Sequence, residues 1–487
     1  MSFNSYFFVL IFLPISVIGY HMLNKRNHFA LGKWFLLCMS LWFSAYATIP
    51  GTMVCAGLIL FNYAVYKYLY KLSNRKLYMI AAVCINVLSL LILKYDSVLY
   101  SRNIFVSENM HSTISLIVPL GISFVTFSQI SFLVDTYREY DKENTYEFID
   151  YALFVLFFPK VTVGPIALSK EFIGQLNESL RKELNWDNVA RGLYAFIFGL
   201  SKKVLIADNL SKIVYFGYGH CYDFGTLNAL ITVVAYSMQI YFDFSGFCDM
   251  AQGISLMLNI DVPVNFNSPY RASSIGEFWD RWHITLTKFF TKYVYIPLGG
   301  NRKGKLRTYV NILIIFLISG IWHGCNITFV VWGLIHGCFM VIERAIKDVY
   351  IKVPKFIRWV VTAIIINISW IFFRAANITE AKLMIKNLLS MDFKPIDPTM
   401  IVTSLPAEME IVQWYMMKIG VNTYYSGLVI IILLIVFAVF ASIFMKNTNE
   451  RITDFKPSGK VAVVAVILLV VSIMSLSSVS TFIYVNF

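Results

Sequence analysis

The stretch NRKGKLRTYVNILIIFLISGIWHGCNITFVVWGLIHGCFMVIER, residues 301–344, carries the pattern that decides the fold. A basic segment opens it, two apolar arms follow, and the polar tip WHGCN at 322–326 separates the arms. Positive charge is retained on the cytoplasmic side of a membrane. The basic residues before the first arm and after the second therefore predict a helical hairpin with both ends in the cytoplasm and His323 at its tip.

The tip of this hairpin is expected to lie within the membrane. The first apolar arm, residues 308–321, has about 14 residues and a length of about 21 Å, whereas the hydrocarbon core is about 30 Å thick. An ionisable side chain at that depth is a functional candidate, and Trp322 and Gly324 beside it could shape a substrate site. The alternative is a neutral His323 that is hydrogen-bonded inside a helix bundle.

Composition extends the membrane assignment to the whole chain. Of its 487 residues, 58% are hydrophobic and 14% are charged, and the mean hydropathy is +0.66. A soluble domain has about 25% charged residues, and a soluble globule could not cover so much apolar surface. The composition therefore excludes a disordered chain, a disulfide scaffold and a nucleic-acid-binding protein, and the net charge of +13 is assigned to membrane topology.

The sequence predicts an all-α polytopic membrane protein with about ten to twelve spans in one membrane domain, residues 1–487. The clear candidate spans are residues 5–20, 30–49, 53–70, 77–95, 227–247, 356–373, 427–444 and 461–484. Three further apolar stretches contain Gly, Pro or Lys and are expected to be broken or re-entrant. They are residues 114–134, 151–168 and 193–206.

Basic clusters between the spans predict that both termini lie outside. Lys25 follows the first span and Lys76 follows the third, which puts the N-terminus outside. The loop 446–460 before the last span is basic and therefore inside, so the C-terminus is outside. The segment 375–423 has few lysines for its length and is expected outside.

A second polar cluster, GEFWDRWHITLTKFF at 276–290, lies upstream of the hairpin. His283 stands there near Glu277, Asp280 and Arg281. One interpretation is an aromatic belt at the membrane interface with solvated charges. The other is a second active-site imidazole that stabilises developing charge.

Other polar residues in apolar stretches favour structural roles. Asp243 and Asp249 are expected to join a buried network, and His336 is expected to be structural. Lys202 and Lys203 could face the phosphates of a nucleotide-bearing donor or could snorkel to the interface. The chain contains neither H-E-x-x-H nor G-x-x-x-x-G-K-[ST], so we predict no metal site and no intrinsic cofactor.

Several motifs together resemble the membrane-bound O-acyltransferase family, and within it the branch that acetylates bacterial polysaccharides such as alginate. They are FWDRWHITL (278–286), YIPLGGNR (295–302), SGIWHG (319–324), WGLIHG (332–337), PLGISFVTF (119–127), FPKVTVGPI (158–166), YFDFSGFCDM (241–250) and FIYVNF (482–487). The resemblance covers most of residues 119–374, flanked by N-terminal helices in 1–95 and C-terminal helices in 424–487.

The resemblance implies that His323 is the principal catalytic histidine and His283 the second active-site histidine. Trp322, Gly324, Trp282 and Asp280, which adjoin these histidines, are candidate substrate contacts, although relatives often carry Arg or Asn where this chain has Asp280. The implied fold is a ring of tilted helices around a thin central region, with funnels opening from both sides.

The resemblance also implies a location, a donor and partners. The expected location is the cytoplasmic membrane of a bacterium, with the lipid bilayer itself as one partner. Acetyl-CoA or another acyl thioester would donate from the cytoplasm. An extracytoplasmic acetyltransferase resembling SGNH hydrolases, and polysaccharide export machinery, would complete transfer to an exported polymer.

The function predicted from the sequence is acetyl transfer to polymer hydroxyls, with His323 as general base and His283 polarising the donor carbonyl. One alternative within the enzyme class is D-alanyl transfer to teichoic acid from a carrier-protein thioester. Another class, a transporter with proton-relay histidines, would be favoured by inverted repeats, and the sequence shows none.

Overall fold

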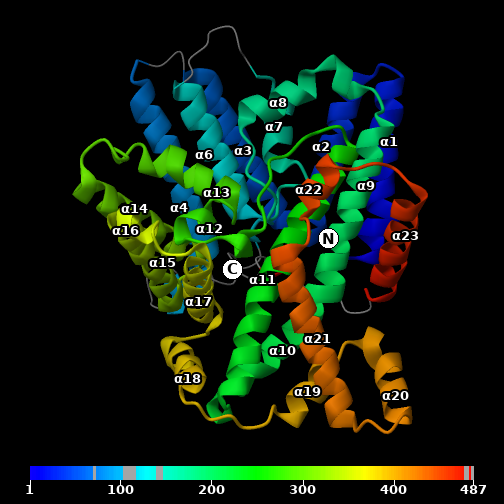
Figure 1. The fold of residues 1–487 in the computed structure, drawn as a ribbon. Helices are drawn as coiled ribbons and strands as arrows, with labels where there is room; N and C mark the ends of the chain where they lie inside the picture. Colours follow the sequence, from blue (N-terminus) through cyan, green and yellow to red (C-terminus); the bar gives the residue numbers. More distant parts are fainter. Residues whose placement is uncertain (70–72, 102–116, 139–145, 477–481, 484–487) are drawn as a thin grey trace. The chain divides into compact units, whose positions relative to one another are not determined.

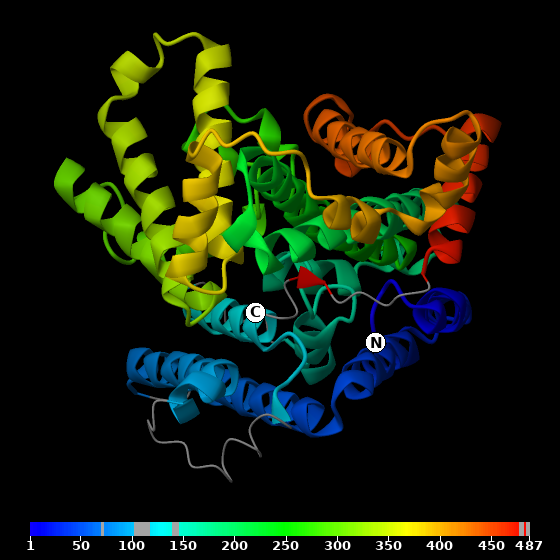
Figure 2. The same cartoon turned by 90° about the horizontal axis from the view of Figure 1, so that it is seen from below.

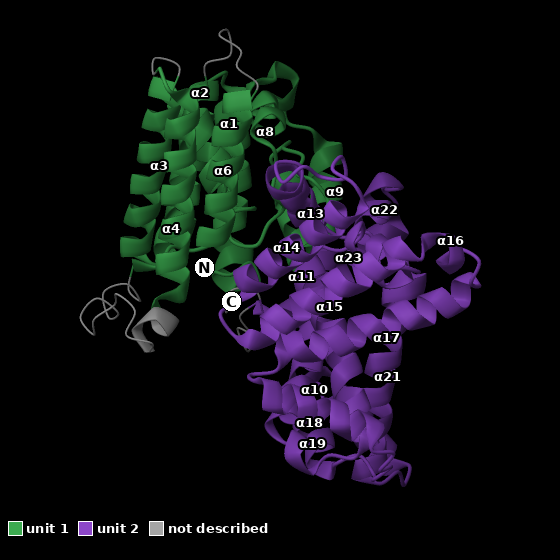
Figure 3. Cartoon of the chain, turned by 90° about the vertical axis from the view of Figure 1, so that its left-hand side faces the viewer, with its two compact units in different colours: residues 1–196, 247–264 green, residues 197–246, 265–487 purple. Residues whose placement is uncertain are grey.

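The computed structural model describes residues 1–69, 73–101, 117–138, 146–476 and 482–483. Within these residues every regular element is a helix, which confirms the all-α prediction. The chain divides into two compact units, residues 1–196 with 247–264 and residues 197–246 with 265–487 (Figure 3). The prediction of a single membrane domain stays a prediction.

Unit 1 begins with a row of four helices in which consecutive members are neighbours, and α6 packs against the third and fourth (Figure 2). A π-helical turn, Phe8–Phe12, leads into α1. The helices of this unit are α1 (Leu13–Lys25), α2 (Phe29–Ala47), α3 (Ile49–Leu69), α4 (Arg75–Ser101), α6 (Ile122–Arg138), α7 (Phe148–Leu156), α8 (Ser169–Asn177) and most of α9 (Trp186–Ser201).

Polar pairs tie the apolar helices of unit 1 together. Asn62 of α3 and Asn86 of α4 exchange two side-chain hydrogen bonds, at 3.1 and 2.7 Å. The Lys33 ammonium lies 2.6 Å from the Asp150 carboxylate. Side-chain hydrogen bonds of this kind join helices where apolar contact alone gives little preference for one arrangement.

Unit 2 holds the hairpin and most of the predicted site residues. Its helices are α10 (Asp208–Gly219), α11 (Thr226–Met257, whose last turns belong to unit 1), α12 (Ile275–Trp279), α13 (Ile284–Phe290), α14 (Lys305–His323), α15 (Ile327–Ala345), α16 (Lys347–Tyr350), α17 (Lys355–Arg374), α18 (Ile378–Leu389), α19 (Pro398–Ser404), α20 (Glu410–Lys418), α21 (Thr423–Phe444), α22 (Thr448–Thr453) and α23 (Gly459–Met474). In Figure 1, α18, α19 and α20 lie at one end of this unit and α22 lies at the other.

Eight helices of the described residues are long and apolar enough to cross a membrane. They include helices at six of the eight clear candidate spans and both arms of the hairpin. The predicted span 227–247 lies within α11, which is longer, at 32 residues. The predicted span 461–484 is wrong at its end, because α23 stops at Met474 after 16 residues.

The three irregular stretches have different outcomes. The stretch 151–168 is broken as predicted, since α7 ends at Leu156 and turns follow. The stretch 193–206 is not broken, because a π-helical turn, Lys202–Ala207, joins α9 to α10 with helical backbone on both sides. Part of the stretch 114–134 lies outside the described residues.

The hairpin arms are longer than the sequence suggested. Both α14 and α15 have 19 residues, or about 28 Å, because α14 begins at Lys305 rather than at the first apolar residue. The predicted length of the first arm is therefore wrong, while the depth of its tip in the membrane stays a prediction. The arms approach closely, since a Cβ atom at Gly333 would lie 2.3 Å from the Phe316 carbonyl oxygen and one at Gly320 would lie 2.5 Å from that of Phe329.

Candidate active site

His323 is the last residue of α14 and is only 3% exposed. Its ring lies edge-on to Trp332 of α15 and Phe373 of α17, with centroids 5.0 Å away in both cases. Trp322 flanks it at 4.6 Å. A Cβ atom at Gly324 would lie 2.4 Å from the Phe329 ring, so the residue after His323 must be glycine for the hairpin to close.

Two hydrogen bonds tie the hairpin tip to the residues that follow α17. The Asn326 amide donates to the carbonyl oxygen of Ala376. The Thr328 hydroxyl donates to the carbonyl oxygen of Ala375 at 3.4 Å. His323 is therefore held where α14, α15 and the end of α17 meet, at the start of the segment 375–423.

His283 precedes α13 in a left-handed backbone conformation, with φ 45° and ψ 50°. Such a conformation is uncommon for a residue other than glycine and often marks a functional position. The side chain is 1% exposed and meets the Phe244 ring edge-on at 4.8 Å. The fold thus buries a second imidazole in unit 2.

An aromatic cluster places both histidines in the same part of unit 2. It runs from Trp282, beside His283, to Trp370 at 5.0 Å, from there to Phe373 at 5.3 Å, and then to His323 at 5.0 Å. Three of the predicted substrate contacts, Trp282, Trp322 and Gly324, adjoin this cluster. The structure records no direct contact between the two histidine rings.

Asp280, the fourth predicted substrate contact, is exposed at the end of α12. Partial burial, and then the neighbouring Glu277 carboxylate, raise the pKa of its carboxyl above the usual value. Glu277 itself accepts hydrogen bonds from the backbone and hydroxyl of Ser273 and pairs with Arg281 at 3.0 Å. The charges near His283 therefore form a local cluster at the protein surface, while His283 points into the aromatic cluster.

His336 of α15 is fully buried, and both of its ring nitrogens are engaged. The Trp279 indole donates to Nδ1 at 3.3 Å, and the Ser369 hydroxyl lies 2.9 Å from Nε2. Because that hydroxyl donates to the Ile366 carbonyl oxygen, Nε2 carries the proton and donates to Ser369. This arrangement fits the structural role predicted for His336.

A buried ionic network lies where α10 and α11 meet, and sequence reasoning had not joined its members. The Lys203 ammonium lies 2.6 Å from Asp243 and 2.8 Å from Asp208. The second oxygen of Asp243 accepts a hydrogen bond from the backbone of Ile483 at 2.8 Å, and the Phe482 ring lies 4.7 Å from the ammonium. The network thus fastens the C-terminal motif to α11, and it supports the structural role predicted for Asp243.

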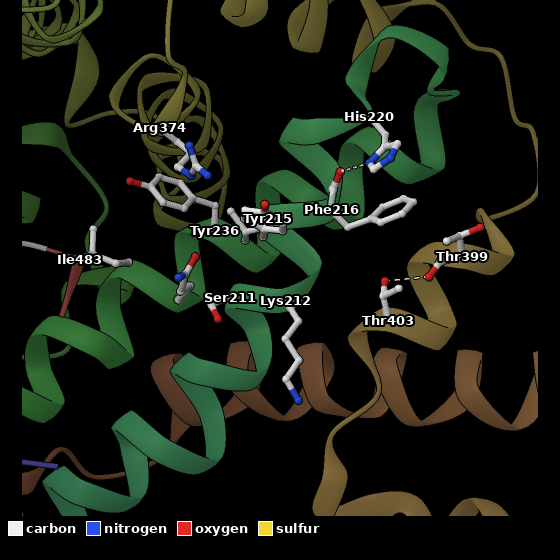
Figure 4. A pocket seen from close by; sticks show the side chains of 12 residues that line it. Ser211, Lys212, Tyr215, Phe216, His220, Tyr236, Arg374, Thr399, Thr403 and Ile483 are labelled. Atoms are coloured by element: carbon white, nitrogen blue, oxygen red, sulfur yellow. Dashed lines mark hydrogen bonds between the residues drawn. The ribbon is translucent and has the colours of Figure 1, made fainter. Parts of the chain in front are cut away.

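Two cavities of unit 2 are lined by different residues of α11, together with different neighbouring helices. The α19 cavity, of about 840 Å³, is lined by residues that include Lys212, Tyr236, Gln239, Arg374, Thr399 and Ile483 (Figure 4). The α22 cavity, of about 270 Å³, is lined by residues that include Phe198, Lys202, Tyr241, Lys446, Thr448 and Arg451. Arg374 directly follows Phe373, so the α19 cavity adjoins the residues that pack on His323.

Comparison with known proteins gives a consistent result. The family model described as membrane-bound O-acyltransferase matches residues 94–379. Peptidoglycan O-acetyltransferase of Helicobacter pylori is 38% identical over 424 residues, which are 80% of this chain and 80% of the relative. The protein named probable alginate O-acetylase AlgI of Pseudomonas aeruginosa is 35% identical over 405 residues, 80% of this chain and 75% of the relative.

A teichoic acid D-alanyltransferase of Bacillus subtilis is also similar to this chain, but less so. It is 27% identical over 275 residues, which cover 54% of this chain and 69% of the relative. The O-acetyltransferases therefore match at higher identity and over a longer part of the chain.

Proposed function

The chain belongs to the membrane-bound O-acyltransferase family, and from that premise we propose that it moves an acetyl group from a cytoplasmic thioester to hydroxyl groups of an exported polysaccharide or cell-wall polymer. It is a multi-pass membrane acyltransferase. The relatives of higher identity and coverage are named as O-acetyltransferases of peptidoglycan and alginate, which supports acetyl over D-alanyl as the group transferred.

The observation that carries the mechanism is the position of His323 at the meeting point of α14, α15 and α17. We assign it the role of general base. It takes the proton of the acceptor hydroxyl while that oxygen forms a bond to the thioester carbonyl carbon. The tetrahedral intermediate then expels the thiolate, and the imidazolium returns the proton to sulfur. A positioned base contributes about 10²–10⁴-fold, and an imidazole has an ordinary pKa of about 6.5.

His283 is assigned the second role, that of stabilising the oxygen of the thioester carbonyl as negative charge develops on it. A hydrogen-bond donor to this oxygen must be held rigidly to be effective. The support for this role is the burial of His283 at the end of the aromatic cluster and its fixed left-handed backbone. Trp322, Trp282 and Gly324 would then form apolar walls that exclude water.

The donor is proposed to be acetyl-CoA, bound at the α22 cavity. This cavity combines aromatic walls with Lys202, Lys446 and Arg451, and the loop 446–460 is predicted to be cytoplasmic. Cationic side chains suit the phosphates of a nucleotide-bearing thioester. Lys202→Gln should therefore raise the KM for acetyl-CoA but not for acetyl-pantetheine, which lacks the nucleotide; an equal rise for both donors would contradict this assignment.

The extracytoplasmic partner, proposed to be an acetyltransferase resembling SGNH hydrolases, would dock on α20. This helix exposes Ile411, Trp414 and Tyr415, a small apolar surface of the kind that marks interaction sites. Helix α18 of the same segment offers less apolar surface, because its Ala381 and Met384 are buried against the protein. The alternative is that α20 lies in the plane of the membrane interface.

The partner proposal is tested with Ile411→Lys/Tyr415→Lys, which spares the packed helices α18 and α19. Docking predicts that acetylation of polymer falls while donor thioester cleavage by the purified protein is unchanged. An interfacial helix predicts weaker contact of α20 itself with lipid and unchanged polymer acetylation in cells that retain the protein. Lys382→Gln, an exposed substitution on α18, is the matched control.

Topology is tested by single cysteines near Lys76, Arg302 and Arg451 in a cysteine-free background. The proposed orientation, with both termini outside, predicts that none of the three reacts with an impermeant thiol reagent added to intact cells. Labelling from outside would overturn it.

The reaction itself is tested with purified protein in nanodiscs, radiolabelled acetyl-CoA, the partner and polymer. Acetyl transfer to polymer supports the proposal. Transfer of D-alanine from a carrier protein without acetyl transfer would favour the teichoic acid function, and solute flux without acylation would favour a transporter.

A further inference from the structure

The α19 cavity is built by four elements and lies near the candidate catalytic histidine. Its walls come from α10, α11, the last residue of α17 and α19 (Figure 4). Its volume of about 840 Å³ is within the range of small-molecule sites, which hold about 300–1,000 Å³. Phe373, which precedes the lining residue Arg374, touches the His323 ring.

Two buried polar groups of this cavity have no hydrogen-bond partner among the described residues. They are the hydroxyl of Tyr236, which is 1% exposed, and the side-chain oxygen of Gln239, which is 9% exposed. Buried polar atoms are nearly always satisfied in folded proteins, and an exception requires an explanation. A bound ligand with hydroxyl groups would supply both partners, since the Tyr236 hydroxyl can donate or accept and the Gln239 oxygen accepts.

The cavity also has a positive charge that the described protein does not neutralise. Arg374 makes no ion pair with a described residue, and its guanidinium lies 4.9 Å from the centre of the Tyr218 ring. The Lys212 ammonium donates to the Leu405 carbonyl oxygen at 3.4 Å. No carboxylate is among the described lining residues. Figure 4 shows Arg374 beside Tyr236, so the free cation and an unsatisfied hydroxyl share one wall.

We propose that the α19 cavity binds a carboxylate-bearing sugar unit of the acceptor, with Arg374 as the carboxylate partner and with Tyr236 and Gln239 as hydrogen-bond partners of its hydroxyl groups. A guanidinium fork matches a carboxylate in two hydrogen bonds. The inference rests on the proposed function and deepens it, because it names the chemical class of the acceptor. A charged sugar held there presents a neighbouring hydroxyl to the side of the cavity nearest His323.

The place of the cavity favours the acceptor over the phosphates of the donor. Its wall α19 belongs to the segment 375–423, which is predicted to lie outside. Helix α22, which lines the cavity proposed for the donor, lies at the other end of unit 2 from α19 (Figure 1). The two cavities have no lining residue in common.

The test compares tetragalacturonate with its methyl ester, in which the carboxylate charges are removed and each carboxyl group carries a methyl group. Binding to the purified full chain in nanodiscs is measured by calorimetry. A hydrogen-bonded charge pair predicts that the acid binds about 10–100-fold more tightly than the ester. Arg374→Gln should remove that difference, whereas Lys386→Gln, an exposed cation on α18 that does not line the cavity, should keep it. Equal binding of the two probes to the unaltered protein overturns the proposal.

Tyr236→Phe gives a second and independent reading. Because this hydroxyl bonds no described residue, its removal should leave the thermal unfolding temperature unchanged or higher. Binding of both probes should nevertheless weaken by about 2–10-fold, the effect of one lost hydrogen bond. Loss of stability with unaltered affinity would show a structural hydroxyl and overturn its role here.

Two further measurements separate this inference from the proposed function. His323→Gln should bind tetragalacturonate as the unaltered protein does. If the unaltered protein binds this probe but transfers no acetyl group, the proposed function is contradicted and the proposed binding site is not. Acetyl transfer that depends on His323 but not on Arg374 or Tyr236 would contradict the proposed binding site and leave the proposed function standing. Arg374-dependent binding of acetyl-CoA instead of the sugar acid would make this a donor cavity and overturn the proposal.

Discussion

His323 and His336 occupy the two arms of one hairpin, and they differ in ways that bear on the catalytic role proposed for the first and the structural role proposed for the second. Both are buried, both touch Trp332, and both are followed by glycine. His336 lies within α15 with its two nitrogens held by Trp279 and Ser369. His323 ends α14 beside the residues that lead into the α19 cavity. Burial and motif are therefore shared, whereas the position in the helix differs, because His323 ends α14 and His336 lies within α15.

His323→Ala should give the largest effect and would break the comparison if it did not. We expect acetyl transfer to fall by about 10²–10⁴-fold, the contribution of a positioned general base, with little change in thermal unfolding. Transfer of labelled acetyl to polymer and the unfolding temperature are measured on the same preparation. A variant that loses stability in proportion to its activity would make His323 structural, like His336.

His283→Ala should follow, with a fall in kcat of about 10²–10³-fold, as for the loss of one donor to a developing oxyanion. The KM for the acceptor should be unchanged, because this side chain is assigned to the donor carbonyl. Steady-state kinetics at varied acceptor concentration measures both kcat and the KM for the acceptor. A raised acceptor KM at unchanged kcat would move His283 from the carbonyl to the acceptor.

The sequence anticipated this site better than it anticipated what surrounds it. Apolar runs locate helices because a span requires about 20 apolar residues whatever lies beside it, and the ordered motifs around His283 and His323 identify a family. The ionic network around Lys203 could not be predicted from apolar runs or from motifs. Its partner Asp243 is 40 residues away, and Ile483, which bonds Asp243, is 240 residues further on, so only the folded chain brings them together.

The errors at helix ends have a local cause. Residues 461–474 are apolar except for Ser472, and α23 stops at Met474. The next seven residues include four serines and a threonine, and Phe482 and Ile483 contact the ionic network on α11. The overall hydropathy of the predicted span does not show this local change. At the start of α14 the predicted helix was too short. Lys305 and Arg307 are helical although charged, so a helix start placed at the first apolar residue came too late in the sequence.

His336→Ala should cost stability rather than chemistry. Removing the ring leaves the buried Trp279 indole without its partner, at about 1–3 kcal/mol for an unsatisfied group, whereas the Ser369 hydroxyl keeps its hydrogen bond to the Ile366 carbonyl oxygen. We expect a lower unfolding temperature in detergent and normal activity per folded molecule. Loss of activity at full stability would erase the distinction between the two histidines.

Ser369→Ala sharpens the same point with the smallest expected effect. It removes one hydrogen bond of His336 and should cost about 1 kcal/mol. Thermal unfolding should show a small decrease, and acetyl transfer should be unchanged. An effect on the pH dependence of activity would indicate that the His336 pair takes part in proton transfer after all.

The most direct test of the central claim is single-turnover acetyl transfer by His323→Gln. Glutamine keeps a hydrogen bond at this position but cannot take up a proton near neutral pH. If His323 is the general base, the variant unfolds at the temperature of the unaltered protein and transfers acetyl at least about 10²-fold more slowly. A folded His323→Gln protein that transfers acetyl at the full rate would contradict the account.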